Sequence, residues 1–213
     1  KVMLLSIDDY YLSKIDRYRI SQKVHPLLMT RGVPGTHDIK KLKEHLGQFK
    51  KKKFPILAPT FNKLKDDISN KTKVINKADI LILEGWCCGS NPIESKFLYK
   101  NLNKVERQLD KDFKWRNYYN SKLKSEYHKI FKSFDRIIYI KPPSFEFVLK
   151  WRYAQEKNNA QKTKTKNFMN KNKIKNFILC YEKLTKWMIK NMPDNADMLI
   201  KVDKDQKIKK IVY

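Results

Sequence analysis

Short apolar runs alternate with amphipathic stretches along the chain. Residues 2–7, 79–83 and 136–140 are short, mostly apolar segments that end in polar or helix-breaking residues, which is the pattern of a buried strand. Residues 198–202 and 207–212 are further strand-like segments near the end of the chain, the second with three lysines. We therefore predict three buried strands followed by two closing strands.

Several of the intervening stretches have helical spacing. After Thr36, which is placed to cap a helix, apolar residues recur at Ile39, Leu42, Leu46 and Phe49. We also expect helices over residues 115–131, from Ser144 through Trp151, and along the apolar stripe from Ile174 to Met188. A polar stretch rich in Lys, Asn and Thr, around residues 152–173, has the composition of a mobile lid.

Strands that alternate with helices predict an α/β fold, with a mostly parallel sheet and helices on both of its faces. A length of 213 residues suits one domain with a substantial core. We therefore expect residues 1–213 to form a single domain.

The formal net charge of +26 changes this picture only in part. A basic surface attracts polyanions such as nucleic acids. The excess, however, is mostly Lys spread along the chain, beside abundant Asn and Ile, as expected of solvent-facing positions in an AT-rich genome. We expect no specific nucleic-acid partner, although a basic rim around a phosphate pocket stays open.

The cysteine pattern and the lengths of the apolar runs indicate the cellular compartment. Three cysteines, two of them adjacent at Cys87 and Cys88, give neither a disulfide framework nor a paired metal-ligand spacing. The longest apolar run, near residues 78–83, is too short to cross a bilayer. We expect a cytoplasmic protein with no membrane partner.

The first candidate for chemistry is the segment Ser6–Leu12, which reads SIDDYYL. Asp8 and Asp9 follow a predicted strand, at the sheet edge where open α/β sheets bind ligands. A carboxylate there can accept a proton from a hydroxyl or help to hold a metal ion. The alternative is that one of them only caps a turn.

Two further segments carry glycines and polar side chains. RGVPGTHD, residues 31–38, contains two of the five glycines and could wrap around a ligand, or be a plain loop before a helix. ILILEGWCCG, residues 80–89, is an apolar strand that ends in Glu84 and has the form of a Walker B strand.

Taken together, these segments resemble the D-glycerate 3-kinase branch of the P-loop kinase superfamily that includes uridine kinase, phosphoribulokinase and pantothenate kinase. The stretches that carry the resemblance are residues 6–11, 31–38, 59–68, 83–89, 115–120, 151–156 and 181–185. The resemblance implies ATP- and Mg²⁺-dependent phosphorylation of a small hydroxylated acid, most closely D-glycerate.

The resemblance also implies roles for single residues. Asp8 would accept the substrate proton, while Asp9 and Glu84 would act beside it through Mg²⁺. Arg31 and His37 would anchor an acidic substrate, since a guanidinium matches a carboxylate. The remaining substrate-binding candidates are Tyr10, Thr36, Asp38, Lys63, Asp67 and Trp86. Arg152 would neutralise phosphate charge from a lid, or be a helix-surface arginine.

The chain departs from the family pattern in two places. It contains no G-x-x-x-x-G-K-[ST] motif. The resemblance therefore implies a fold that lacks the first strand, the P-loop and the first helix. In the segment PTFNKLKDDIS, Asn62, Leu64 and Ile68 stand where the family has Asp, Ser and Arg. These changes leave open a uridine or pantothenate kinase activity, altered specificity, or a catalytically inactive binding protein.

Overall fold

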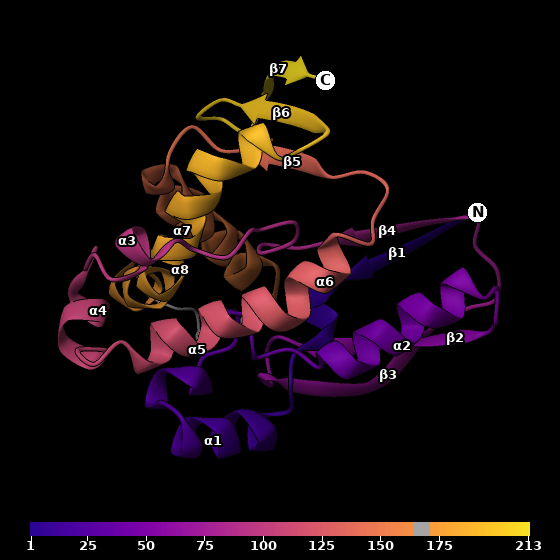
Figure 1. Ribbon diagram of the computed structural model, residues 1–213, viewed down its shortest axis with the longest axis horizontal. Coiled ribbons are helices and arrows are strands. Elements are labelled where there is room, and N and C mark those ends of the chain that lie inside the picture. The colour runs from indigo at the N-terminus through magenta and orange to yellow at the C-terminus, as the bar shows by residue number, and fades with distance from the viewer. Residues whose placement is uncertain (164–170) are drawn as a thin grey trace. The chain divides into compact units, whose positions relative to one another are not determined.

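A computed structural model describes residues 1–163 and 171–213 (Figure 1). The chain divides into two compact units, residues 1–92 with 112–133 and residues 93–111 with 134–213. The expectation of a single kinase-like domain stays a prediction. Residues 164–170 of the expected lid lie outside the described residues.

The first unit is built on a parallel pair of strands, β1 (Val2–Ser6) and β4 (Ile80–Glu84). Their register places Ser6 opposite Glu84, so both strands deliver their carboxyl ends to the same edge. Along β1 the side chains alternate: Met3 and Leu5 are buried, while Val2 and Leu4 face outward. The predicted strand 2–7 thus ends one residue early, because residue 7 begins a 3₁₀ turn, η1 (Ile7–Tyr10).

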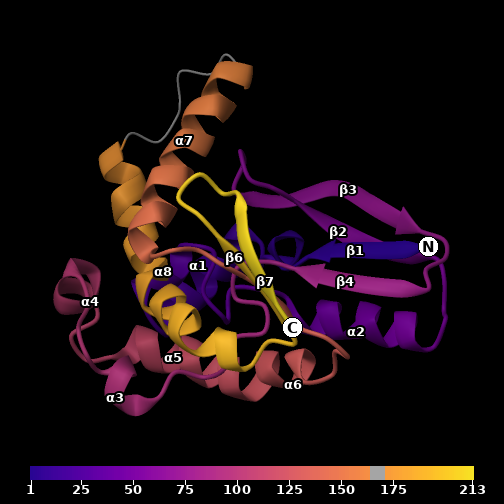
Figure 2. The same ribbon diagram turned by 90° about the horizontal axis from the view of Figure 1, so that it is seen from above.

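An antiparallel hairpin follows in the same unit. It consists of β2 (Ile56–Asn62) and β3 (Asp67–Ile75), with a register shift between Pro59 and Phe61. Figure 2 shows the hairpin as a long ribbon. Its turn brings residues 63–66 back toward η1, which is how the hairpin contributes to the site described below.

Five helical segments complete the first unit before its last helix. They are α1 (Lys14–Lys23), η2 (Pro26–Met29), α2 (Ile39–Lys50), α5 (Lys114–Lys122) and a π-helical turn, η3 (Leu123–Tyr127). The last helix, α6 (His128–Phe131), continues directly from η3. In α2, Leu42 and Leu46 are buried as their spacing predicts. The residue that caps α2 is Asp38 and not the expected Thr36.

The second unit combines short and long helices with three strands. The helices are α3 (Ser95–Leu98), α4 (Lys104–Leu109), α7 (Phe145–Thr163), α8 (Lys171–Asn191) and the 3₁₀ turn η4 (Met192–Asp194). The strands are β5 (Ile138–Lys141), β6 (Met198–Val202) and β7 (Ile208–Val212). β5 pairs with β6 in parallel, and β7 adds an antiparallel edge.

α7 and α8 lie side by side (Figure 2), and Phe145 packs on Ile178 in a cluster that includes Val148, Tyr153 and Phe177. The helices that the sequence predicts after Ser144 and around Ile174–Met188 are therefore confirmed, each longer than expected. Each unit contains one parallel pair of strands, β1 with β4 in the first unit and β5 with β6 in the second, as expected for the predicted α/β class. No helix among the described residues is long and apolar enough to cross a membrane.

Candidate functional site

The carboxyl ends of β1 and β4 carry the acidic side chains that the sequence singles out. β1 runs into η1, which holds Asp8 and Asp9, and β4 ends at Glu84. A glycine is required directly after Glu84. Gly85 has φ +150°, and a Cβ on it would lie 2.3 Å from Cγ2 of Ile7, the residue before Asp8. The two strand ends are therefore packed in direct contact.

The segments SIDDYYL and RGVPGTHD are joined through their backbones. The amide of Asp38 donates to the carbonyl of Tyr10 at 2.6 Å, and the amide of Leu12 donates to the carbonyl of Thr36 at 2.9 Å. Tyr11 and His37 form an isolated antiparallel bridge between these bonds. These two bonds join residues that lie 24 and 28 positions apart in the sequence.

Asp8 is held by two donors from different segments. One carboxylate oxygen accepts from the Tyr11 hydroxyl at 2.9 Å, and the other accepts from the Lys63 ammonium in the hairpin turn at 2.9 Å. Partial burial raises the pKa of Asp8, but the bond to Lys63, its positive charge and the Tyr11 bond outweigh this and hold the pKa below its usual value. Asp8 is therefore a half-buried carboxylate that stays ionised at neutral pH.

Asp9 points to the hairpin instead. Its Oδ1 accepts the backbone amide of Phe61 at 3.0 Å, which ties η1 to β2. Its Oδ2 has no hydrogen bond within residues 1–163 and 171–213. Asp9 therefore anchors the hairpin with one oxygen and offers the other.

His37 is buried next to Asp8. Its ring stacks on Tyr11, with ring centroids 4.5 Å apart, and its Nδ1 lies 2.7 Å from the Tyr127 hydroxyl. Burial lowers the pKa of His37 to about 4, even though the charge of Asp8 acts to raise it. His37 is therefore neutral at physiological pH. Its Nε2 is buried without a hydrogen-bond partner in the described part of the chain.

Tyr127 completes this wall of the site from the helix η3. Its hydroxyl bonds His37 and also accepts the amide of Gly35 at 2.8 Å. Gly35 has φ +94°, and a Cβ there would lie 2.6 Å from the ring of Tyr118. The loop of residues 31–38 is thus held tightly against the helix. Cys87, also buried here, has its pKa raised to about 12 by burial and by the charge of Asp8, so it is an inert thiol.

Arg31 is engaged within the protein. Its guanidinium contacts the carboxylate of Asp66 and lies over the ring of Phe61 at 5.5 Å. Arg17, which is fully buried, pairs with the same carboxylate at 3.1 Å and donates to the Asp66 carbonyl at 2.5 Å. Two arginines therefore fix the hairpin turn, and Asp66 is left with little unbalanced charge.

Four predicted substrate-binding residues have structural contacts. Tyr10 is buried with its hydroxyl on Nδ1 of His45 at 2.8 Å. Thr36 is buried, donates to the Val33 carbonyl and accepts the Gly32 amide. Asp38 caps α2 by accepting the amide of Lys41, and Asp67 accepts the amide of Lys14 at the start of α1. These four side chains bind the protein's own backbone and side chains.

The remaining predicted residues differ in placement. Glu84 is exposed, and its carboxylate has no hydrogen bond in the described part of the chain. Trp86 is half-buried in the turn that follows Glu84. Arg152 lies on α7 in the second unit, where it donates to Gln155 at 2.6 Å. The structure therefore groups Asp8, Asp9, His37 and Lys63, with Glu84 on the adjoining strand end.

Sequence reasoning missed Tyr11 and Tyr127. Tyr11 lies over Asp8 because side chains at positions i and i+3 of the 3₁₀ turn η1 lie above one another, and no sequence pattern indicated this turn. No local pattern marks Tyr127, because its partners lie 90 or more residues away.

The donor set fits a hard divalent cation. Mg²⁺ prefers carboxylate oxygens and water, and Asp9 and Glu84 each offer carboxylate oxygen that is not consumed by the protein. The ionised Asp8, beside the cation Lys63, can accept a proton from a hydroxyl group that hydrogen-bonds to it. This arrangement suits transfer of a charged group to an alcohol.

The chain is similar to proteins that are named kinases. It is 26% identical over 192 residues to the uncharacterized kinase mug58 of Schizosaccharomyces pombe, which covers 84% of this chain and 67% of that protein. It is 38% identical over 100 residues to the probable ATP-dependent kinase TDA10 of Saccharomyces cerevisiae, which covers 41% of this chain and 34% of that one. The chain therefore spans from one third to two thirds of these relatives. No family model matches the chain.

A solved structure of a D-glycerate 3-kinase from Cryptococcus neoformans var. grubii has the same fold. The TM-score is 0.80 at 24% identity, and the match covers 100% of this chain and 79% of that one. This likeness confirms the predicted α/β fold class.

Proposed function

Taking this chain as a relative of the P-loop kinases, within the superfamily that includes the D-glycerate 3-kinases, we propose that it transfers a phosphoryl group from ATP to a small hydroxylated acid. D-glycerate is the first candidate for the acceptor. When bound, ATP with Mg²⁺ supplies the phosphoryl group. The residues of this chain bind the acceptor, orient its hydroxyl and take up its proton.

The observation that carries the proposal is the carboxylate of Asp8, held ionised by Lys63 and Tyr11 at the carboxyl end of β1. The acceptor hydroxyl donates its proton to Asp8 as its oxygen forms the new bond to phosphorus, and the bond from phosphorus to the leaving phosphate oxygen breaks. Tyr11 and Lys63 fix the direction of the carboxylate, so the proton is accepted at a defined position.

Charge at the site suits an acidic acceptor. The Lys63 side chain is 60% exposed, which leaves its ammonium able to meet a substrate carboxylate, and the Arg31 guanidinium contacts Asp66 of the same hairpin turn. His37 is neutral and can act only as a hydrogen-bonding group at physiological pH. Asp9 and Glu84 would hold Mg²⁺.

Asn62, which stands where the family has Asp, is compatible with the proposed kinase role. The side chain of Asn62 accepts the amides of Leu64 and Lys65, both at 3.0 Å, so it forms the hairpin turn that presents Lys63. Leu64 and Ile68 are exposed at the same turn, where the family has polar residues. This observation supports an altered acceptor as the second candidate, with pantothenate and uridine as the compounds to compare.

Because the chain contains no G-x-x-x-x-G-K-[ST] motif, the experiment joins it to the P-loop segment of a relative and measures release of ADP from Mg-ATP in the presence of D-glycerate, pantothenate or uridine. We expect Asp8→Asn to lower kcat by about 100- to 10,000-fold, because it removes the proton acceptor, with a much smaller effect on the binding of D-glycerate. Asp135→Asn, at an exposed acid in the second unit, is the matched control and should leave turnover unchanged.

Full activity in Asp8→Asn would remove Asp8 as the base. Binding of D-glycerate without ADP release from any acceptor would favour the alternative of a catalytically inactive binding protein. We further propose a cytoplasmic location, because the described cysteines at positions 87, 88 and 180 are free thiols, and no specific nucleic-acid partner.

A further inference from the structure

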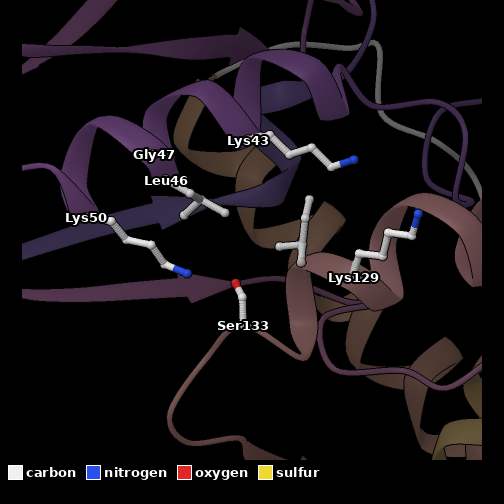
Figure 3. Close-up of a pocket in the computed structure, with 7 residues that line it drawn as sticks. Lys43, Leu46, Gly47, Lys50, Lys129 and Ser133 are labelled. Atoms are coloured by element: carbon white, nitrogen blue, oxygen red, sulfur yellow. The ribbon is translucent and has the colours of Figure 1, made fainter.

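The first unit contains a second hollow, away from Asp8 and its partners. It lies between α2 and α6 and has a volume of about 210 Å³ (Figure 3). The residues that line it are Lys43, Leu46, Gly47, Lys50, Lys129, Ile130 and Ser133. None of them belongs to the proposed kinase site.

The walls of this hollow are basic on both sides. Figure 3 shows Lys43 on α2 and Lys129 on α6 at one end of the hollow, and Lys50 on α2 at the other end, near Ser133, which lies just beyond the end of α6. In the described part of the chain, none of the three lysines forms an ion pair. Three ammonium groups with no acidic partner create a positive potential that favours an anion, and Ser133 offers a hydroxyl donor.

The floor between the lysines is apolar. Leu46 is 8% exposed and Ile130 is 4% exposed, so both side chains are packed below the hollow and present carbon to it. A free inorganic anion would use the lysines alone. An anion that carries a small apolar body would also cover this floor and gain from its burial.

Gly47 gives an independent reason to regard the hollow as a binding site. Four of the five glycines have positive φ, at positions 32, 35, 85 and 89, where the backbone needs glycine. Gly47 lies inside the helix α2, and a Cβ on it would have no heavy atom within 4 Å. Neither backbone conformation nor packing explains it, and Ala would be the better helix former.

We propose that the hollow binds a small organic phosphate, with the phosphate at the end lined by Lys43 and Lys129 and the apolar body on Leu46, Gly47 and Ile130, toward Lys50. Lysines bind phosphate as point charges, without the fixed geometry of arginine, which suits an open site between two helices. The missing side chain at Gly47 leaves the space for the apolar body. The proposal does not depend on kinase activity, because it uses no residue of the Asp8 site.

The test is a fluorescence titration with 1-naphthyl phosphate at low salt. We expect it to bind at least tenfold more tightly than inorganic phosphate, which lacks the apolar body, and than 1-naphthol, which lacks the charge. Gly47→Leu should weaken binding at least tenfold by filling the hollow, while thermal unfolding shows a melting temperature equal to or above that of the wild type.

Two triple variants that remove the same charge distinguish binding in the hollow from general electrostatic attraction of the anion to the basic protein. Lys43→Gln, Lys50→Gln and Lys129→Gln together should abolish saturable binding. Lys71→Gln, Lys77→Gln and Lys209→Gln together remove the same charge from exposed positions elsewhere and should preserve it. Equal losses in the two triple variants, or unchanged binding in a folded Gly47→Leu protein, would overturn the proposal. Asp8→Asn should leave the titration unchanged, which keeps this outcome separate from the kinase proposal.

Discussion

Two ionisable residues at the candidate site differ in charge because their surroundings differ. Asp8 has cationic and hydroxyl donors within 3 Å, and these keep it ionised despite partial burial. His37 has a phenol as its only described hydrogen-bond partner, so burial favours its neutral form. The pair therefore combines one negative charge with one neutral ring at neutral pH.

Protonation of His37 is expected to destabilise the protein in mild acid. In the unfolded chain the pKa of histidine is near 6.5, and in the folded protein that of His37 is about 4. Between these values the unfolded state binds more protons, so stability falls as pH falls from 6.5 to 4. At about 1.4 kcal/mol per unit, the loss is about 3 kcal/mol.

The measurement is the free energy of unfolding of wild type and His37→Gln at pH 7 and at pH 4.5. The wild type should lose more stability than the variant over this interval. His128→Gln, at a half-buried histidine with a smaller pKa shift, should keep the wild-type dependence. Identical pH dependence in wild type and His37→Gln would show that His37 is not held neutral.

At the scale of elements, the strength of the apolar pattern decided what the sequence could predict. The strands β1, β4 and β5 and the helices α2, α7 and α8 lie where the apolar pattern places them. The prediction that these strands are buried is wrong in part, because one face of each is exposed and β4 contains no buried residue. The hairpin was missed because β3 is mostly polar and exposed and buries only Ile75, so its sequence shows no alternation. α1 was missed because it is polar almost throughout, and what fixes it is the buried side chain of Arg17.

The same reasoning applies to the candidate site. The acids at the strand ends could be predicted, because a strand pattern followed by a carboxylate is local. The sequence could not predict that Tyr11 contacts Asp8 while Tyr10 does not, because this depends on the 3₁₀ geometry of η1. It could not predict the contact of His37 with Tyr127 either, because that contact depends on the tertiary fold.

In the second unit, α8 depends on a buried lysine. Lys183 is 2% exposed and donates to the carbonyls of Phe97 and Lys100 at 3.0 and 2.5 Å. Its ammonium also lies 3.4 Å from the buried carboxylate of Glu106. One side chain thus ties α8 to the ends of α3 and to α4.

Replacing this lysine should be costly. Lys183→Met keeps the apolar stem but removes the ammonium that lies beside the buried carboxylate of Glu106 and donates to two carbonyls, and we expect a loss of about 3–5 kcal/mol. Chemical denaturation measures it. Lys190→Met, at an exposed position of α8, is the control and should change stability by less than about 0.5 kcal/mol. A similar small change in Lys183→Met would show that the buried pair contributes little.

At the scale of the whole molecule, the basic charge and the apolar surface act in opposite directions. The net charge of +26 opposes self-association through repulsion. In the first unit, however, the outer face of the β1–β4 pair is apolar: Val2, Leu4, Ile80 and Ile82 are each about half exposed. A continuous apolar face of this kind promotes association when salt screens the charge.

Two substitutions on this face should reduce association without loss of stability. Replacing both Leu4 and Ile82 by Thr introduces β-branched side chains that strands accept, and it removes exposed apolar area. We expect weaker binding of an apolar dye and less light scattering at high salt, with an unchanged melting temperature. Met3→Thr, on the buried face of the same strand, should lower the melting temperature instead. Unchanged scattering in the double variant would place the association surface elsewhere.

The π-helical turn η3 sets the direction in which the helix that begins at Lys114 presents Tyr127 to the site. Trp115, Tyr119, Leu123 and Tyr127 follow one another at steps of four residues, and all are buried. In a regular α-helix each such step advances by about 40° around the axis, so Tyr127 would have rotated away from the wall that Trp115 faces. The wider turn, closed by the bond from the His128 amide to the Leu123 carbonyl, takes back part of that rotation. Deleting one residue between Leu123 and Tyr127 would therefore swing the tyrosine out of phase and disconnect it from both His37 and Gly35, with every residue of the segments 6–12 and 31–38 unaltered.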